Sequence, residues 1–376
     1  MLLPQNCILG LWLFSVFDGF ARRRLPVKSG HNYENNVFFW GKIGKIGKNF
    51  IILHVSSSRA SLQCLNRLGF FIFHISIMAK VHFAKIYKQP SELVRLLQNR
   101  SLVVPDCKEA EGYIQSIGYY RLSAYMHPFL LTPKANHKFK TRTNFNQILR
   151  LYRFDKKLRI ILFNEIEKIE IAVREAVMNM SAEITGDIFW LTNNVHFHDK
   201  NIFNSSMSLL KKEYDKSTED FIEHFKQTYI EPYPPAWILG ELLPMGNVNI
   251  YYRNLKDKTL KKKIAKRFYL HAPVFESWLS VLTLTRNACC HHSRVWNKVN
   301  KIIPNDMRGM TRPWITLPSD KKRIYYNICI IKYFLDVISP NNDFISKLQR
   351  LFVDFPEIDL AAMGFPANWE TEPLWH

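Results

Sequence analysis

Apolar side chains recur at three- and four-residue steps over much of this chain, and that spacing is typical of amphipathic helices. The clearest case follows Asn144, where apolar positions from Ile148 to Leu162 predict a long helix that continues to Gly186. Shorter helices are predicted over 91–99, 108–117, 236–243, 277–285, 320–338 and 345–352. No strand-rich region and no glycine-rich phosphate loop is visible in the pattern. The pattern therefore predicts an all-α fold class.

The first 77 residues differ from the rest of the chain in charge and in pattern. Asp18 and Glu34 are their only acidic residues against a larger set of Lys and Arg, and the run 41–48 repeats Gly, Lys and Ile. We therefore expect residues 1–77 to be a non-native or disordered N-terminal extension, with Met78 as the natural start. A membrane-surface anchor is the alternative.

Two apolar runs in this extension, 8–17 and 70–78, bear on membrane association. Both are shorter than the roughly 20 apolar residues that a membrane-spanning helix needs. A basic cluster follows the first run, which reverses the order found in a signal peptide. We expect no stable membrane insertion.

The composition indicates a polyanionic partner. The chain has 376 residues, with 52 Lys plus Arg against 32 Asp plus Glu and a formal charge of +20. Such a balance favours nucleic acid or an anionic membrane surface and does not choose between them. Hydrophobic residues make up 47%, which is enough for a packed core. Six cysteines without regular spacing do not form a disulfide framework, so a reducing cytoplasm is the simpler location.

A basic stretch over 256–267 is the strongest local candidate for phosphate contact. Only Asp257 opposes it, and Tyr251, Tyr252 and Phe268 lie near its ends. Such a run is usually a solvated helix face, but cations near aromatic rings also suit RNA phosphates and unstacked bases. The candidate RNA-binding residues are Lys261, Lys262, Lys263, Lys266 and Arg267.

The densest group of chemically active side chains follows the predicted helix 277–285. It reads Arg286-Asn287-Ala288-Cys289-Cys290-His291-His292-Ser293-Arg294. Charged and polar side chains are costly to bury here unless they do chemistry or form a paired network. Histidine moves protons near neutral pH, and arginine offers a charged fork to phosphate oxygens. Because RNA carries its own nucleophile, the 2′-hydroxyl, these side chains suit metal-free cleavage in a cleft that sets in-line geometry.

Helical geometry separates Arg286 from His291. On an ideal helix they lie about 140° apart around the axis and about 7.5 Å apart along it. One straight helix does not easily place both on a single phosphate, whereas two protomers that meet along this helix could. Asn287 lies one turn before His291 and faces it, which favours His291 over His292 for proton transfer. Arg294 is a candidate for further phosphate charge, and His292 either contributes or packs.

Other interpretations of this motif stay open. A zinc site fits poorly, because neighbouring side chains on a helix diverge by about 100° and structural sites space their ligands by two or more residues. For a cysteine nucleophile, nothing marks either thiol as activated. A structural network of histidine and arginine is the strongest alternative. Glu170 and Arg174, four residues apart on the long predicted helix, form either a solvated salt bridge or a brace for Arg286.

The spacing of the arginine and the histidines resembles that of HEPN-type ribonucleases. The run from Arg286 to Asn297 further resembles the Abi family of bacterial abortive-infection proteins, the AbiD/AbiF group. One departure is Cys290, where family members more often have a small residue. The resemblance covers roughly residues 85–370 in order. Its other parts are Gly118 to Leu122 with Tyr125 and Pro128-Phe129, Phe154-Asp155 with Leu158-Arg159, 166–170 with Arg174, Pro235 and Trp237 with Glu241 and Gly246, Ser277 to Leu279, and 363–369.

The resemblance implies a HEPN-like helical bundle with additional N- and C-terminal helices. Its parts would be an N-terminal helical segment over 78–140, a HEPN-like catalytic helical core over 141–311 and a C-terminal helical segment over 312–376. It also implies a metal-independent RNA endonuclease that acts as an abortive-infection toxin in antiphage defence, as a cytoplasmic homodimer without a cofactor. A structured small RNA or a neutralising partner could restrain it.

The same resemblance suggests roles for the motif residues. Arg286 would bind the phosphate, His291 would transfer the proton and Asn287 would orient the imidazole. Candidate supporting residues are His292, Arg294, Glu170 and Arg174. Attack by the 2′-hydroxyl would leave a 2′,3′-cyclic phosphate and a 5′-hydroxyl. The alternative from another class is a non-catalytic RNA-binding protein of a defence or regulatory complex.

Overall fold

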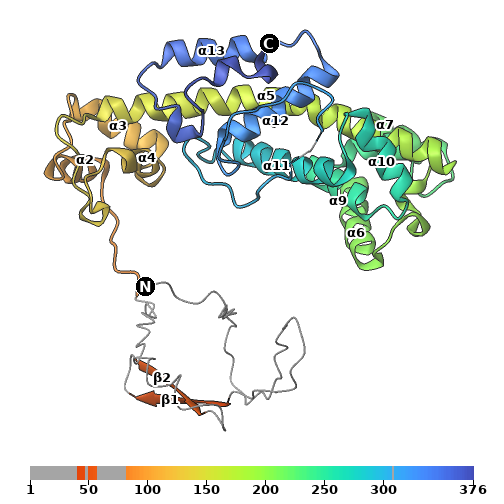
Figure 1. Ribbon diagram of the computed structural model, residues 1–376, viewed down its shortest axis with the longest axis horizontal. Coiled ribbons are helices and arrows are strands. Elements are labelled where there is room, and N and C mark those ends of the chain that lie inside the picture. Colours follow the sequence, from red (N-terminus) through yellow and green to blue (C-terminus); the bar gives the residue numbers. More distant parts are fainter. Residues whose placement is uncertain (1–39, 47–49, 57–81, 307–308) are drawn as a thin grey trace, which may run out of the picture. The chain divides into compact units, whose positions relative to one another are not determined.

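The computed structural model describes residues 40–46, 50–56, 82–306 and 309–376 (Figure 1). The chain divides into two units, residues 1–86 and 87–376. In the first unit, β1 (Trp40–Ile46) pairs antiparallel with β2 (Phe50–Ser56). The expected extension over 1–77 falls largely outside the described residues and stays a prediction. Within the described ranges, no helix is both long enough and apolar enough to cross a membrane.

The second unit is built from α-helices that are joined by turns and short 3₁₀ segments, which confirms the all-α prediction. Its helices are α2 (Pro90–Asn99), α3 (Cys107–Ile117), α4 (Tyr119–Met126), α5 (Phe145–Thr185), α6 (Lys200–Lys216), α7 (Asp220–Thr228), α8 (Ala236–Leu239), α9 (Met245–Asn254), α10 (Lys258–Arg267), α11 (Ala272–Cys290), α12 (Ile324–Ile338) and α13 (Phe344–Asp354). All helices predicted from the apolar pattern are present, although several ends are shifted. The helices α4, α6, α7 and α9 are not among the predicted ranges.

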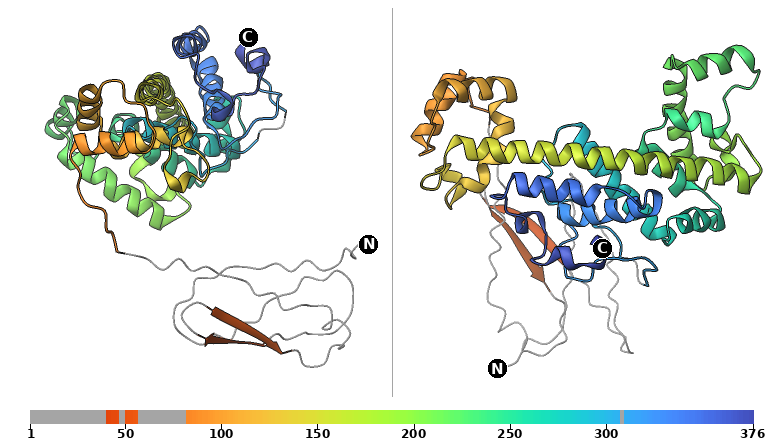
Figure 2. Two further views of the ribbon diagram at one scale, coloured as in Figure 1. Left: turned by 90° about the vertical axis from the view of Figure 1, so that its left-hand side faces the viewer. Right: turned by 90° about the horizontal axis from the view of Figure 1, so that it is seen from above.

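The long helix α5 is the axis of this unit. Its first turn is closed by a capping box, in which the Asn144 side chain accepts from the Gln147 N–H at 3.0 Å and the Gln147 side chain accepts from the Asn144 N–H at 3.0 Å. Gly186 ends the helix in the left-handed conformation, with φ of 67°. Because no Gly or Pro interrupts its 41 residues, the helix extends for about 60 Å. It runs through the whole unit in Figure 2.

The core forms where α4, α11, α12 and α13 pack against α5. The helix α12 is buried over most of its length, and its Tyr333 packs edge-on against Trp278 of α11, with ring centroids 5.3 Å apart. Trp314 stacks on Trp278 at 4.8 Å and also packs edge-on against Tyr333, with ring centroids 5.8 Å apart. The Asn327 amide of α12 donates to the Thr285 hydroxyl of α11 at 2.9 Å. These contacts fix α11, which carries the motif, between α5 and α12.

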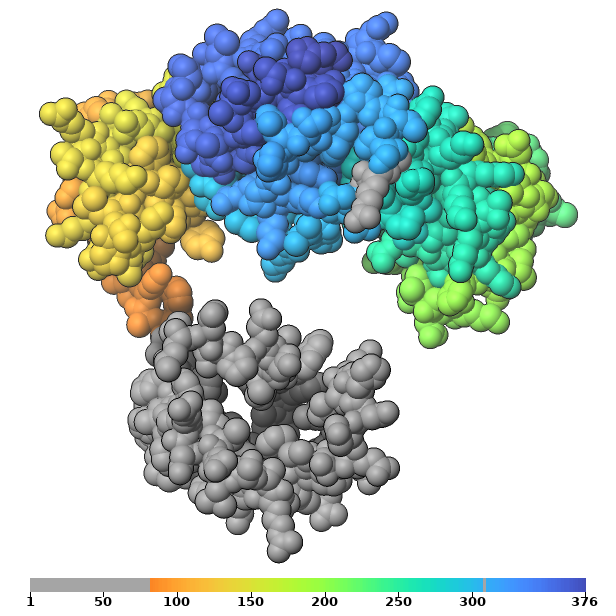
Figure 3. All heavy atoms as spheres, in the orientation of Figure 1, coloured from red at the N-terminus to blue at the C-terminus, as the bar shows by residue number. Residues whose placement is uncertain are grey.

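The C-terminal residues, blue in Figure 3, cover the middle of the helical unit. Gly364 has φ of 92°, and a Cβ atom there would lie 2.5 Å from the Cβ atom of Arg323. Only glycine fits this close approach. The turn brings Phe365 against Tyr325 of α12, with ring centroids 4.6 Å apart. The segment 363–369 is therefore a packing element of the helical core.

Candidate functional site

The motif straddles the C-terminal end of α11. Arg286 and Asn287 lie in the last turns, and His291 is the C-cap residue, whose N–H donates to the Asn287 carbonyl at 2.9 Å. The next residue, His292, has a left-handed φ of 54° and turns the chain away from the helix axis. The ideal-helix geometry therefore applies as far as Cys290, and the two histidines lie at and beyond the helix end.

Arg286 is held against α5 by an ion pair and a ring contact. Its Nε atom lies 3.3 Å from Glu170 Oε2, and its guanidinium lies 5.9 Å from the ring centroid of Phe163. The Arg286 side chain keeps 30% of its surface exposed, against 10% for Glu170. Part of the Arg286 side chain thus remains accessible to solvent.

Glu170 joins two arginines at this place. Its Oε1 atom lies 3.4 Å from Arg174 Nη2 and accepts from the Met245 N–H at 3.0 Å. Arg174 also contacts Glu241 at 3.2 Å and donates to the Leu243 carbonyl. Glu170 and Arg174 are therefore not an isolated solvated pair. The contact with Arg286 that a brace requires is present, and its role in catalysis stays a prediction.

Asn287, His291 and His292 are all exposed. Among the described residues, no hydrogen bond joins the Asn287 amide to the His291 imidazole, and the two residues are linked through the backbone alone. The proposed orienting contact is thus absent from this geometry. The assignment of proton transfer to His291 rather than His292 therefore stays a prediction, which cleavage assays of the two alanine variants can test.

A buried carboxylate on α5 fixes the segment that follows the histidines. Asp155 is fully buried, and its Oδ1 atom accepts from the backbone N–H groups of Val295 at 3.1 Å and Trp296 at 2.7 Å. Its Oδ2 atom accepts from the Tyr125 hydroxyl at 2.6 Å and pairs with Arg159. Burial raises the pKa of the Asp155 carboxyl, and the Arg159 charge and these donors oppose that effect.

The helix α4 holds the same segment from another side. Arg121 donates to the His292 carbonyl at 2.6 Å, and Arg294 donates to the Ala124 carbonyl at 2.8 Å. Both guanidiniums thus bond to neutral acceptors, so these contacts leave their positive charge uncompensated. Burial, together with the charges of Lys134 and Arg294, lowers the pKa of the neighbouring His127. The surroundings of the two histidines are therefore electropositive, as a phosphate-binding site requires.

The motif contains two neighbouring cysteines, and Cys289 lacks the surroundings that activate a thiol. Burial raises the pKa of the Cys289 thiol to about 12, so this thiol is protonated at neutral pH. Cys289 is buried while His291 and His292 are exposed, so these side chains do not converge on one point. In the part of the chain that the structure describes, no group of three or more His, Cys, Asp or Glu side chains is placed to hold a metal ion.

The basic stretch forms α10, and most of its candidate side chains are exposed. Lys262, Lys263, Lys266 and Arg267 face solvent. Lys261 instead pairs with Glu276 of α11 at 2.5 Å. Because Glu276 is 15 residues before His291, α10 lies about 20 Å from the histidines along α11. The structure does not place these cations beside the motif.

The aromatic residues that flank the basic stretch do not face solvent. Tyr251, Tyr252 and Phe268 are each at most 1% exposed, and Phe268 stacks on Phe275 with ring centroids 5.1 Å apart. These rings are therefore not available to stack on RNA bases, because they form the hydrophobic core between α9, α10 and α11.

The sequence reasoning missed how the motif is anchored. Tyr125, Asp155 and Arg159 entered only as parts of the resemblance, and Arg121 only as a residue of its opening segment. The available signal was that Asp155 and Arg159 lie among the apolar positions of α5, where charges are buried only when paired.

Residues 112–297 match the model of a family described as Abi-like protein. The match includes α5, α11 and the whole motif, while 363–369 lies outside it. No curated protein and no solved structure matches the chain. This match supports membership of the chain in the Abi-like protein family.

Proposed function

We propose that this protein is an abortive-infection toxin that acts as a metal-independent HEPN-type endoribonuclease of the AbiD/AbiF group. The observation that carries the proposal is the double attachment of the motif to α5. Glu170 contacts Arg286 on one side of the helix end, and Asp155 holds the backbone just after the histidines. Attachment of this kind preorganises charge and proton-transfer groups without a metal.

The reaction assigns separate tasks to the exposed groups. The 2′-hydroxyl of RNA attacks the adjacent phosphate, and His291 transfers the proton with His292 beside it. Arg286 binds the phosphate oxygens and stabilises the charge that develops in the transition state, while Arg294 and Arg121 add positive potential. The 5′-oxygen leaves with a proton, so the products are a 2′,3′-cyclic phosphate and a 5′-hydroxyl. Asn287 presents an exposed amide near the C-terminal end of α11, close in sequence to the two histidines.

A second copy of the chain would complete this site. Arg286 is drawn to the α5 side of α11, whereas His291 caps the helix end. Beside Arg286, the solvent face of α5 exposes Ile160 (58%), Phe163 (37%) and Ile171 (55%). The same face exposes Asn164 and Glu167, so it is a mixed apolar and polar surface, as non-obligate interfaces are. We assign this face, named the α5 face, to a homodimer in which Arg286 and His291 from both protomers surround one cleft.

The proposed setting is the bacterial cytoplasm, with RNA as substrate. The cations of α10 would bind RNA phosphates upstream or downstream of the cut, since about 20 Å corresponds to several nucleotides. A structured small RNA or a neutralising partner would restrain the toxin between infections.

The test is cleavage of end-labelled RNA by the purified full chain in excess EDTA. Arg286→Ala and His291→Ala should each lower the rate at least about 100-fold, and His292→Ala and Asn287→Ala should each lower it less, because His292 is not the assigned proton-transfer group and the Asn287 amide does not contact the His291 imidazole. The matched controls are Arg95→Ala on α2 and His224→Ala on α7, both exposed and remote in sequence from the motif. They should cleave as the parent does.

The outcomes separate the proposal from its rival. Full activity in both histidine variants would refute the nuclease assignment. RNA that binds tightly but stays intact with the parent protein would indicate a non-catalytic RNA-binding protein. Loss of activity in EDTA, restored by a divalent ion, would refute the metal-independent mechanism.

A further inference from the structure

The helix α4 presents an aromatic ring to solvent beside the motif. The buried residues of this helix are Leu122, Tyr125 and Met126. At about 100° per residue, Tyr120 lies on the opposite side of the helix from all three. Tyr120 is accordingly 91% exposed. A single exposed apolar side chain is ordinary on a protein surface, so the meaning of this ring depends on what surrounds it.

Two hydrogen bonds join this turn of α4 to the motif. Tyr120 directly precedes Arg121, whose guanidinium donates to the His292 carbonyl at 2.6 Å. One turn after Tyr120, the Ala124 carbonyl accepts from Arg294 at 2.8 Å. The exposed ring is therefore carried by the part of α4 that contacts the segment of the two histidines.

Basic side chains accompany Tyr120 on this side of α4. His127 lies two turns after Tyr120, because this C-cap residue keeps helical dihedral angles, with φ of −54° and ψ of −37°. Its Nδ1 atom lies 3.3 Å from Lys134 Nζ. Burial and then the charges of Lys134 and Arg294 lower the pKa of His127, so both cations lie near this imidazole. We name Tyr120, Arg121, His127, Lys134 and Arg294 the Tyr120 surface.

The two chain segments that form the Tyr120 surface contain no acidic residue. Residues 112–154 carry Lys or Arg at positions 121, 134, 138, 140, 142, 150 and 153, and residues 277–305 carry them at 286, 294, 298 and 301. Three of the four acidic residues that border these segments, Asp155, Glu276 and Asp306, are each paired with a cation. The segments therefore bring positive charge without a carboxylate of their own, and this favours an anionic ligand.

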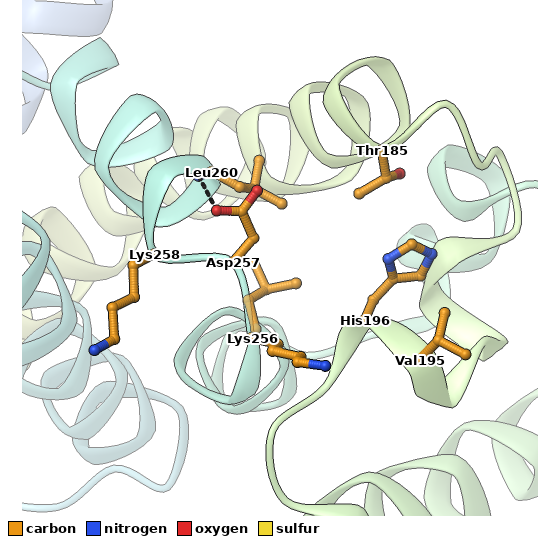
Figure 4. Close-up of a pocket in the computed structure, with 8 residues that line it drawn as sticks. Thr185, Val195, His196, Lys256, Asp257, Lys258 and Leu260 are labelled. Carbon is orange, nitrogen blue, oxygen red and sulfur yellow. Dashed lines mark hydrogen bonds between the residues drawn. The ribbon is translucent and has the colours of Figure 1, made fainter.

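The cations of the Tyr120 surface differ from those at the other end of α5. Among the described residues, its two guanidiniums and its ammonium contact carbonyl or imidazole groups and no carboxylate. In the pocket of Figure 4, by contrast, Asp257 stands between two lysines in the sequence, and His196 pairs with Asp187 at 2.9 Å. Carboxylates offset the cations there, whereas the charge of the Tyr120 surface stays available to a ligand.

We propose that the Tyr120 surface binds single-stranded RNA beside the cleavage site, with an unpaired base stacked on the Tyr120 ring. Lys134 and Arg294 bind the phosphates that flank this base. An exposed ring offers a stacking platform to any unpaired base, whereas the bases of a duplex are already stacked within the helix. An acidic peptide would match the charge and leave the ring without a stacking partner. The surface therefore selects unpaired RNA at the cut.

Tyr120 is a positioning residue in this proposal, because its ring touches a base rather than the reacting atoms. The inference rests on the proposed function only for the reaction that follows binding. Binding itself requires no cut, so it can be measured on an oligonucleotide whose 2′-hydroxyls are methylated and cannot attack the phosphate. Failure of binding and failure of cleavage are then separate results.

The experiment is fluorescence polarisation of the full chain with a fluorescein-labelled 2′-O-methyl oligonucleotide, single-stranded or annealed to its complement. Tyr120→Ala should weaken binding of the single strand at least about fivefold, and Tyr120→Phe less than about twofold, because stacking needs the ring and not the hydroxyl. The duplex should bind the parent protein at least about fivefold more weakly than the single strand. Lys134→Ala should weaken binding and lower its salt dependence by about one phosphate contact.

Matched controls and a spectroscopic readout exclude an indirect effect. Tyr229→Ala, at the end of α7, and Lys212→Ala, on α6, remove exposed side chains remote in sequence from the Tyr120 surface and should change binding less than about twofold. In an oligonucleotide that contains 2-aminopurine, the parent protein and Tyr120→Phe should quench the fluorescence of this base, while Tyr120→Ala should not. Melting curves report whether each variant is folded.

The outcomes distinguish this inference from the proposed function. Parent-like binding by Tyr120→Ala, or equal affinity for the duplex and the single strand, would overturn the inference. Tighter binding of poly-glutamate than of RNA would also overturn it and indicate an acidic protein partner. If the binding differences hold while natural RNA stays intact, the nuclease assignment alone fails. If natural RNA is cut and Tyr120→Ala changes neither binding nor cleavage, the role of Tyr120 alone fails.

Discussion

Removal of the Asp155 carboxylate should destabilise the fold and inactivate the site together. Asp155→Ala leaves the Arg159 guanidinium buried without its partner, and it leaves the Val295 and Trp296 N–H groups without an acceptor. Breaking a buried ion pair on one side costs about 3–5 kcal/mol. Tyr125→Phe removes only one hydroxyl donor to the same carboxylate and should cost about 1 kcal/mol.

A double variant separates stability from positioning. In Asp155→Leu with Arg159→Met, both charges are replaced by apolar side chains, which often restores stability. The two N–H groups still lack an acceptor, so the segment that follows His292 stays unanchored. We expect the free energy of unfolding to recover by more than half, while RNA cleavage stays at least about tenfold below the parent rate.

The assay is urea unfolding followed by tryptophan fluorescence, with RNA cleavage measured on the same preparations well below the transition. Loss of less than about 1 kcal/mol in Asp155→Ala would show that the carboxylate is not holding the buried arginine. Recovery of both stability and full cleavage in the double variant would refute a positioning role for Asp155. Tyr125→Phe reports the background effect of disturbing the same network by one hydrogen bond.

Three further outcomes follow from other features. Ile171→Glu on the α5 face should weaken the proposed homodimer at least about tenfold in light scattering, because it buries a charge, and an unchanged dimer would exclude this face. Since burial raises the pKa of Cys289 to about 12, iodoacetamide at pH 8 should label the exposed Cys107 far faster, as mass spectrometry can measure; equal labelling would contradict the burial. A chain that begins at Met78 should keep its melting temperature and RNA binding, and loss of either would show that residues 1–77 belong to the fold.

The bounds of α5 could be predicted from the sequence more fully than those of the other helices. The Asn144 capping box and Gly186 mark the ends of that helix locally, so its bounds could be predicted. The helix α6 also carries a regular apolar stripe, with Phe203, Met207, Leu210 and Tyr214 at steps of four, three and four, so its pattern is sufficient to predict it. A helix as short as α4, with 8 residues, is instead placed by tertiary packing rather than by pattern.

The candidate site was predictable in its residue types and not in its contacts. Arg286 and His291 could be chosen from their chemistry and spacing. The partner of Arg286, Glu170, lies 116 residues earlier, and Asp155 lies 140 residues before Val295. No local pattern pairs positions so far apart. The burial of Tyr252 beside the basic stretch was not predictable either, because a short helix does not reveal which of its faces is buried.

The helix α5 is continuous over its whole length, so the angular positions of its side chains are fixed relative to one another. Asp155 and Glu170 lie 15 residues apart on this helix, about 22 Å along its axis, and they hold the backbone after the histidines and the Arg286 side chain, respectively. Deleting one residue between them would turn everything beyond it by about 100° and shift it by about 1.5 Å. A loop after the helix cannot correct this rotation, because the rotation separates two positions within the helix itself. Insertions and deletions inside α5 should therefore be eliminated through evolution, while substitutions at exposed positions outside the α5 face should be tolerated.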